Sequence, residues 1–151
     1  MEKRKIVAIS GGFDPIHIGH VRMFQEAKAL GDELVVILNN DNWLAHKKGF
    51  SFMPEDERKE IIEAIAGVDR VVITDHAPED SDRSVCRALR EIQPHIFANG
   101  GDRKPDGDPV PEVGVCDELI EMVYNIGAGG KVQSSSWLIA KAAQNTPDAK
   151  K

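Results

Sequence analysis

The fold is indicated first by residues 5–20, which read Lys5-Ile6-Val7-Ala8-Ile9-Ser10-Gly11-Gly12-Phe13-Asp14-Pro15-Ile16-His17-Ile18-Gly19-His20. An apolar run is followed by a glycine turn and then by an amphipathic stretch that starts near Ile18, so the predicted order is strand, turn, helix. Two histidines fall in the first helical turn. Main-chain N–H groups and the positive end of a helix dipole make such a turn an anion site, and two imidazoles can add hydrogen bonds to phosphate oxygens. The segment therefore predicts a cradle for a nucleoside triphosphate.

Length and composition are those of one globular domain. The 151 residues can bury a substantial core, and we expect a domain over 1–144 with a disordered tail over 145–151. The net charge of −6, with both signs interspersed, argues against a nucleic-acid-binding surface. The chain has no apolar run of membrane-spanning length and no signal-peptide pattern, so we expect a cytoplasmic protein without a membrane partner. Cys86 and Cys116 lack a CxxC spacing and are expected to be reduced, buried thiols.

Short β-branched runs alternate with segments of helical periodicity along the whole chain. The alternation predicts an α/β fold: a single-domain, Rossmann-like, doubly wound parallel sheet of about five strands with helices on both faces. The predicted strands are 5–10, 33–39, 70–74, 95–99 and 120–126. The predicted helices run from near Ile18 to Gly31, from Pro54 to Gly67, from Ser81 to Ile92, from Pro111 to Glu118 and from Ser134 to Gln144. In the second of these helices we expect an apolar face made of Ile61, Ile62 and Ile65.

In such a sheet, ligands bind outside the carboxyl ends of the strands. That rule gathers five loops around one site: 10–17, 39–54, 75–80, 99–108 and 127–134.

The turn also carries a family resemblance. Gly12-Phe13-Asp14-Pro15 followed by His17-Ile18-Gly19-His20 resembles the signature of the HIGH-motif nucleotidyltransferase superfamily. The resemblance implies transfer of a nucleotidyl group from a nucleoside triphosphate to a phosphorylated small-molecule acceptor, by in-line attack on the α-phosphorus with release of pyrophosphate. It also implies Mg²⁺ bound through the nucleotide phosphates, and we expect no metal site built from the protein's own residues.

His17 and His20 are the expected catalytic residues of this turn, because side chains three apart share one face of a helix. Two other interpretations stay open: the histidines act only as caps or packing groups, or they bind a metal together with Asp14. The glycines allow phosphate to approach the main chain. The residues expected to bind the nucleotide here are Gly11, Gly12, Phe13, Asp14 and Gly19.

Residues 39–48 are polar and are expected to form a functional or mobile loop. The family has a lysine here that reaches a phosphate, and Lys47 or Lys48 matches it. Trp43 either lines the acceptor pocket or holds the loop in place. Arg58 stands where relatives often have an arginine and is a candidate for acceptor binding, although a lone helical arginine is normally a surface charge.

Two later segments complete the expected site. Asn99-Gly100-Gly101-Asp102-Arg103 resembles a Lys-Gly-Gly-Asp segment of heptose-phosphate adenylyltransferases, with Asn99 in the place of the lysine. Gly100 and Asp102 are assigned to the nucleotide and Arg103 to the acceptor, with a plain glycine turn as the alternative. Ser134, Ser135 and Ser136 match the hydroxyl positions of the family's second motif and are assigned to the nucleotide, with an ordinary helix cap as the alternative. The basic residue expected about one turn later is absent, since Ile139 stands there, and Lys131 or Lys141 is the candidate substitute.

The resemblance covers residues 5–143 and is closest to heptose-1-phosphate adenylyltransferases and glycerol-3-phosphate cytidylyltransferases. It leaves open whether ATP or CTP is the donor. Two other hypotheses remain: a nucleotidyltransferase with another acceptor, such as an amino-alcohol phosphate or a coenzyme precursor, and a non-catalytic nucleotide-binding regulatory module. A homodimer is possible through Trp137, Phe50 or Phe52, although burial in the core or loop packing is the commoner role of such side chains.

Overall fold

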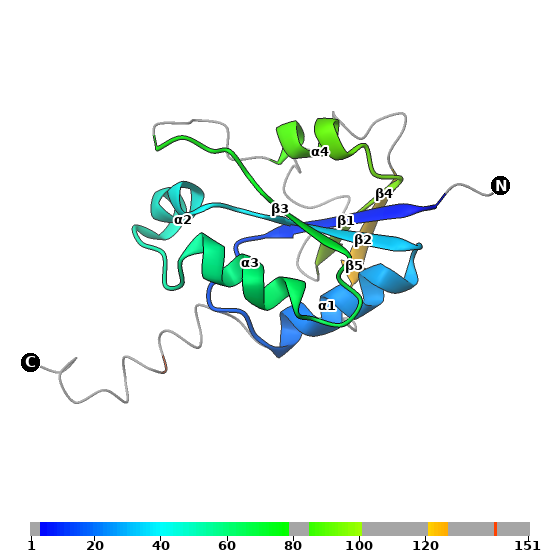
Figure 1. Cartoon of the computed structure of the whole chain (residues 1–151), viewed down its shortest axis with the longest axis horizontal. Coiled ribbons are helices and arrows are strands. Elements are labelled where there is room, and N and C mark those ends of the chain that lie inside the picture. Colours follow the sequence, from blue (N-terminus) through cyan, green and yellow to red (C-terminus); the bar gives the residue numbers. More distant parts are fainter. Residues whose placement is uncertain (1–3, 79–84, 101–120, 127–140, 142–151) are drawn as a thin grey trace, which may run out of the picture.

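Five parallel strands form one sheet in the computed structural model, which describes residues 4–78, 85–100, 121–126 and Lys141. The strands lie in the order β3-β2-β1-β4-β5 (Figure 1). Their bounds are Ile6–Gly11 for β1, Glu33–Leu38 for β2, Arg70–Ile73 for β3, Ile96–Gly100 for β4 and Glu121–Ile126 for β5. The chain builds outward from β1 to β3 and then returns to the other side of β1, so the topological switch point lies between β1 and β4.

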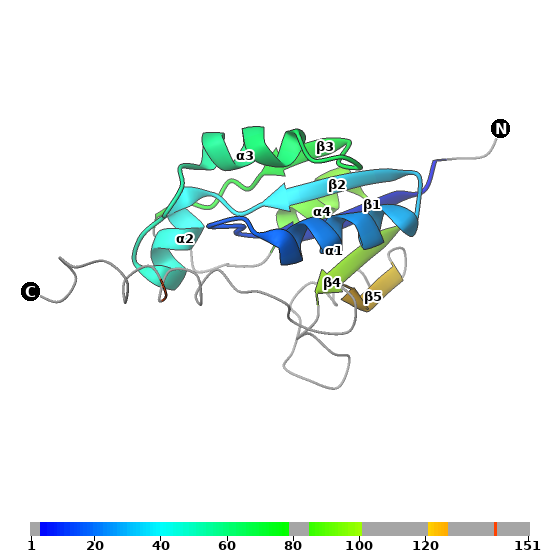
Figure 2. The same cartoon turned by 90° about the horizontal axis from the view of Figure 1, so that it is seen from below.

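Helices cover both faces of the sheet. The described helices are α1 (Ile18–Ala29), α2 (Asp41–Lys48), α3 (Glu55–Glu63) and α4 (Cys86–Ile92). Helices α1 and α3 lie on one face and α4 lies on the other, while α2 stands beyond the carboxyl ends of the strands (Figures 1 and 2). This arrangement confirms the predicted doubly wound α/β fold.

Successive side chains of the central strands enter different cores, because a strand points them to opposite faces. On β1, Val7 and Ile9 pack with α1 and α3, whereas Ala8 packs with α4. On β4, Ala98 joins the first core and Phe97 the second. Burial on both faces explains the apolar runs Ile6–Ile9 of β1 and Leu34–Leu38 of β2.

All five predicted strands are confirmed, and none of their ends differs from the prediction by more than one residue. Helix α1 is confirmed as well, and Phe24 and Ala27 are its buried apolar residues. Gly31 follows its C-cap, as predicted. The glycine also provides space there, since a Cβ atom on it would lie 2.7 Å from the main-chain oxygen of Lys5.

The prediction for residues 39–48 is wrong: this segment is helix α2 and not a loop. Asn40 caps the helix by accepting a hydrogen bond from the Trp43 N–H at 2.9 Å. At the other end, Gly49 adopts the left-handed conformation, with φ of 86°, that ends many helices. The polar run Asn39-Asn40-Asp41-Asn42 is therefore a helix start in which the capping residue and the first-turn acid follow the strand directly.

Helix α3 ends at Glu63, four residues before Gly67. Of its predicted apolar face, Ile62 is buried and Ile65 is partly buried beyond the helix end, but Ile61 is 39% exposed. Phe50 and Phe52, in the connection from α2, are 46% and 57% exposed, so they are not core residues. Loop packing or an interface stays the prediction for them.

Helix α4 supports the predicted helix 81–92 over its second half, and residues 81–84 lie outside the described part. The predicted helix 111–118 lies outside it too, as does the helix over 134–144 except for Lys141, which is helical. Cys86 is a buried free thiol, as expected. Within the described residues, no helix has the length and apolarity needed to cross a membrane.

Candidate functional site

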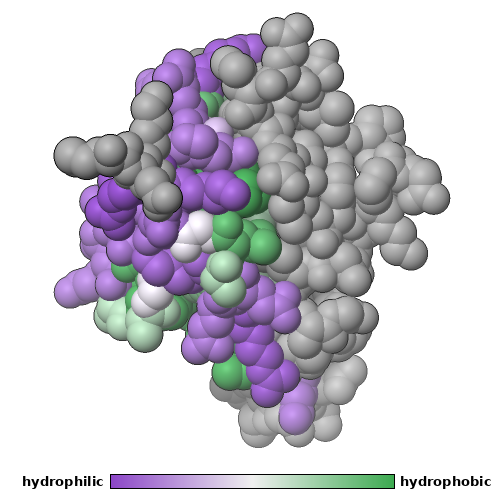
Figure 3. Space-filling model, turned by 90° about the vertical axis from the view of Figure 1, so that its right-hand side faces the viewer, coloured by the Kyte–Doolittle hydropathy of each residue, from purple (hydrophilic) through white to green (hydrophobic). Residues whose placement is uncertain are grey.

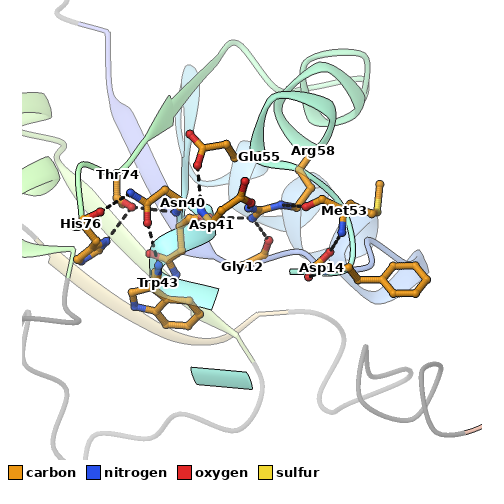
Figure 4. A network of polar contacts seen from close by, with 12 residues as sticks. Gly12, Asp14, Asn40, Asp41, Trp43, Met53, Glu55, Arg58, Thr74 and His76 are labelled. Atoms are coloured by element: carbon orange, nitrogen blue, oxygen red, sulfur yellow. Dashed lines mark hydrogen bonds and ion pairs between the residues drawn. The ribbon is translucent and has the colours of Figure 1, made fainter. Parts of the chain in front are cut away.

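Buried polar side chains gather at the carboxyl edge of the sheet. Asp14 follows β1, Asn39 and Asn40 follow β2, and Thr74 and His76 follow β3. Arg58, on α3, completes the six buried polar or charged side chains found among the described residues. Figure 4 shows most of them as one network of contacts that runs from His76 to Asp14. At the opposite edge, in the view of Figure 3, the described surface is mainly hydrophilic. The carboxyl edge is therefore the candidate site.

The glycine turn after β1 is held tightly by its neighbours. The Asn39 N–H donates to the Gly11 carbonyl at 2.9 Å, which continues the strand pairing into the turn. A Cβ atom on Gly12 would lie 2.9 Å from Leu44 Cδ2 and 3.5 Å from the ring atom Cζ3 of Trp43. Helix α2 thus packs directly against the turn, and the Trp43 ring forms part of its wall.

Phe13 and Asp14 fix the turn from inside the protein. Phe13 is buried with φ of 50°, a conformation that costs a non-glycine residue about 1–2 kcal/mol. Its ring meets those of His20 and Phe24 edge to face, with centroids 4.8 and 5.1 Å apart. The buried Asp14 carboxylate accepts hydrogen bonds from the N–H groups of Phe52 and Met53 at 2.5 and 2.6 Å. Asp14 therefore joins the turn to the segment between α2 and α3.

The two histidines form a reciprocal cap at the start of α1. His17 is the N-cap residue, and its Nδ1 accepts a hydrogen bond from the Gly19 N–H at 3.1 Å. His20 Nδ1 accepts one from the His17 N–H at 3.2 Å. The rings stack with centroids 3.7 Å apart and an angle of 24° between their planes.

This cap determines where each imidazole carries its proton. A neutral ring whose Nδ1 accepts a hydrogen bond bears its proton on Nε2, which is then a hydrogen-bond donor. Capping and phosphate binding are therefore compatible roles, because they use different nitrogens of the same ring. In the described ranges, no group of three or more histidine, cysteine or acidic side chains is placed to hold a metal ion.

Helix α2 brings Trp43 and Lys47 to the same side of the turn. The Lys47 ammonium lies 4.9 Å from the centroid of the Trp43 ring, within the range of a cation–π contact. Lys47 is exposed, so its long side chain can reach an anion near the turn. Lys48 is the last residue of α2, and the position of its side chain lies outside the description.

Arg58 is buried, and the expectation of a surface charge for it is wrong. Its side chain is fully inaccessible and donates to the carbonyl oxygens of Gly12, Asn39 and Met53 at 2.7, 2.7 and 2.9 Å. It also forms an ion pair with Asp41 at 2.7 Å. The guanidinium thus ties together the turn, the end of β2, the start of α2 and the segment before α3. These contacts make Arg58 a positioning residue, and its contact with the acceptor stays a prediction.

Sequence reasoning missed a second group of contacts, at the end of β3. The Thr74 hydroxyl accepts a hydrogen bond from the Asn40 N–H at 3.0 Å and lies 2.8 Å from His76 Nδ1. The side-chain amides of Asn40 and Asn42 both donate to the His76 carbonyl at 2.8 Å. The polar run Thr74-Asp75-His76 directly after a strand was the available signal, and Thr74 and His76 are the buried members of it.

One buried side chain at this edge has no partner. Asn39 is 4% exposed, and its Oδ1 makes no hydrogen bond to any described residue. A buried acceptor without a partner costs about 1–3 kcal/mol, so such an atom calls for an explanation.

The remaining predicted site residues are placed only in part. Gly100 ends β4 at the same edge, paired with Ile126. The other predicted site residues lie outside the described part of the chain: Asp102, Arg103, Ser134, Ser135 and Ser136.

Comparisons with known proteins bear on the family. The model of the cytidylyltransferase-like family matches residues 8–126. The bifunctional protein HldE of Pelobacter propionicus is 37% identical over 144 residues, which are 94% of this chain and 26% of that protein. The FAD synthase of Ferroglobus placidus is 38% identical over 103 residues, which are 68% of this chain and 62% of that protein. This chain therefore spans less than two thirds of the length of either relative.

A solved structure supports the same assignment. The lipopolysaccharide core biosynthesis protein from Thermoplasma volcanium superposes with a TM-score of 0.64 at 26% identity, covering 83% of this chain and 98% of that one. The matched residues 8–126 include the glycine turn, both histidines and all of α2 and α3. The chain belongs to the cytidylyltransferase-like family of nucleotidyltransferases.

Proposed function

We propose that this protein transfers a nucleotidyl group from ATP or CTP to a sugar phosphate or polyol phosphate and releases pyrophosphate. The single observation that carries the proposal is the pair of stacked, capping histidines at the start of α1. Their geometry puts two Nε2–H donors at the positive end of a helix, beside a glycine turn. This is a site for an anion with several oxygens, as a triphosphate is.

The reaction needs no covalent intermediate. An oxygen of the acceptor phosphate attacks the α-phosphorus, and the bond from that phosphorus to the bridging oxygen breaks as pyrophosphate leaves. The protein contributes position and charge stabilisation. In this proposal His17 and His20 donate to the triphosphate, and Lys47 or Lys48 adds positive charge from α2. Mg²⁺ bound through the nucleotide would offset the charge of the phosphates that His17, His20 and the α2 lysine hold.

The remaining assignments follow from the sequence motifs. Gly100 and Asp102 would hold the nucleoside on the β4 side of the turn, and Ser134–Ser136 would contact the phosphates from the opposite side. Trp43 would line the acceptor pocket, since its ring already forms a wall of the turn.

The likeness to a lipopolysaccharide core biosynthesis protein favours the sugar-phosphate acceptor, as does the resemblance of the sequence motifs to heptose-1-phosphate adenylyltransferases. The match to an FAD synthase favours a second candidate, a phosphorylated coenzyme precursor such as a flavin mononucleotide.

The test is pyrophosphate release with Mg²⁺, with ATP and CTP each combined with heptose 1-phosphate, glycerol 3-phosphate, an amino-alcohol phosphate and flavin mononucleotide. We expect release from one combination, and its loss in His17→Ala and His20→Ala. Arg22→Ala, an exposed change on the same helix, is the matched control and should retain full activity. Nucleotide binding without release from any combination would contradict the proposal and favour a regulatory module.

A further inference from the structure

We propose that Asn39 binds a hydroxyl group of the acceptor and thereby helps to select polyhydroxylated substrates. This inference rests on the proposed function, because it assigns a residue to the acceptor side of that reaction. It starts from the unpartnered carboxamide at the end of β2.

Asn39 differs from every other buried polar residue of this edge. Asp14, Asn40, Arg58, Thr74 and His76 all make side-chain hydrogen bonds. Asn39 is equally buried, and its Oδ1 makes no hydrogen bond with the described residues. Folding alone gives no reason for a polar group here, because an apolar side chain of the same shape would avoid the cost of an unmade hydrogen bond.

The main chain holds Asn39 in place. Its N–H donates to the Gly11 carbonyl at 2.9 Å, and its carbonyl oxygen accepts from the Arg58 guanidinium at 2.7 Å. These two contacts attach Asn39 to the glycine turn on one side and to the buried arginine on the other. The carboxamide is therefore presented by a fixed backbone, which is the condition for a preorganised binding group.

The chemistry of a carboxamide indicates the type of ligand group. An amide offers one acceptor and one donor, whereas phosphate oxygens at neutral pH are mainly acceptors. A hydroxyl group both donates and accepts, so it satisfies Oδ1 as well as Nδ2. Asn39 therefore suits the hydroxyl groups of a sugar or polyol, and a phosphate would leave its Oδ1 unpaired.

The sheet order indicates which substrate supplies that hydroxyl. Asn39 follows β2, on the side of β1 away from β4 and β5. In the proposed arrangement the triphosphate lies at the turn after β1 and the nucleoside lies on the β4 side. The β2 side of the turn, next to the Trp43 wall, is then left for the acceptor.

The experiment compares Asn39→Leu with the wild type, using the acceptor found by pyrophosphate release. Leucine has the branching of asparagine and no hydrogen-bonding group. We expect the KM for the acceptor to rise about 10- to 100-fold, because two hydrogen bonds are lost. The KM for the nucleotide should stay within about twofold, because only acceptor contacts are removed. The thermal midpoint should be unchanged or higher, because no hydrogen bond of the fold is removed.

Gln25→Leu is the matched control, since it removes an exposed carboxamide on α1 and should change neither KM. An acceptor that lacks one hydroxyl should bind the wild type more weakly, yet lose little further affinity with Asn39→Leu. Asn39→Ala, which avoids any steric effect of leucine, should shift the acceptor KM in the same direction.

Three results would overturn the inference: an unchanged acceptor KM, an equal rise of both KM values, or a lower thermal midpoint with normal acceptor binding. If the wild type releases no pyrophosphate, the proposed function fails separately, and calorimetry with the same sugar and polyol phosphates decides on Asn39. Binding to the wild type that is weakened in Asn39→Leu would support the assignment, and no binding to the wild type would overturn it.

Discussion

Removal of the Arg58 guanidinium should destabilise the protein strongly, although the residue was expected at the surface. In Arg58→Met, the carbonyl oxygens of Gly12, Asn39 and Met53 lose charged donors, and Asp41 loses its ion-pair partner. An acceptor that loses its donor costs about 1–3 kcal/mol, so the loss of the Arg58 contacts together should cost about 3–5 kcal/mol. The three carbonyls account for most of this cost, because the Asp41 side chain is 38% exposed and its ion pair is screened by solvent.

Urea denaturation followed by circular dichroism measures this loss. Asp41→Asn should cost about 1 kcal/mol or less, because it removes the screened charge and leaves an acceptor oxygen. The loss of stability in Arg58→Lys should lie between those of Arg58→Met and Asp41→Asn, since an ammonium keeps the charge but lacks the planar set of donors of a guanidinium. Arg22→Met, an exposed arginine on α1, should change the free energy of unfolding by no more than about 0.5 kcal/mol. A loss in Arg58→Met as small as that of Arg22→Met would refute the role given to Arg58.

Three further predictions concern a histidine, a glycine and an aspartate. His17→Ala should lower kcat about 10²- to 10³-fold and the free energy of unfolding by about 1 kcal/mol. His17→Asn should restore the cap and the stability but not kcat. Recovery of turnover in the asparagine variant would contradict a phosphate role. Gly31→Ala should lower the free energy of unfolding, measured by urea denaturation, by about 1–3 kcal/mol, because its Cβ would lie 2.7 Å from the Lys5 carbonyl oxygen. The loss should be larger than in Gly12→Ala, where only the end of the Leu44 side chain must move. Hydrogen bonds from the Lys28 ammonium and the Leu34 N–H hold the pKa of Asp69 below its usual range. The Asp69 carboxylate therefore stabilises the fold fully when the pH is above its unfolded-state pKa of about 3.9. This stabilisation is lost as the pH falls through the folded-state pKa. The stability difference between the wild type and Asp69→Asn should accordingly shrink on acidification below about pH 4, and a difference that is independent of pH would exclude this linkage.

The strands and the glycine turn were predictable because their signals are local. Buried parallel strands give continuous apolar runs, and the Gly11–His20 segment carries its turn and helix start within ten residues. The two-sided burial of β1 and β4 also follows from the alternation of helices along the chain.

Helix α2 was missed although its signals were present. The polar residues Asn39–Asn42 indicate a loop by composition, but Asn40 and Asp41 are typical of a helix start and Gly49 of a helix end. Composition alone predicts a loop here, whereas these positional signals predict the eight-residue helix between them.

The role of Arg58 could not be predicted from its own surroundings in the sequence. Its partners are carbonyl oxygens of residues 46, 19 and 5 positions earlier, together with Asp41. Carbonyl oxygens carry no sequence signal, so only the fold reveals the contacts. The same holds for Asn39, because only the fold shows that no described residue places a hydrogen-bond donor near its Oδ1.

Isotopic labelling of the nucleotide distinguishes nucleotidyl transfer from transfer of the terminal phosphoryl group. The wild type, Mg²⁺ and the active acceptor would be incubated with the triphosphate labelled with ³²P at either the α or the γ position, and the products separated. We predict that the α label enters the product with the acceptor and that the γ label is released in pyrophosphate. Entry of the γ label into the acceptor, or its release as inorganic phosphate, would contradict nucleotidyl transfer.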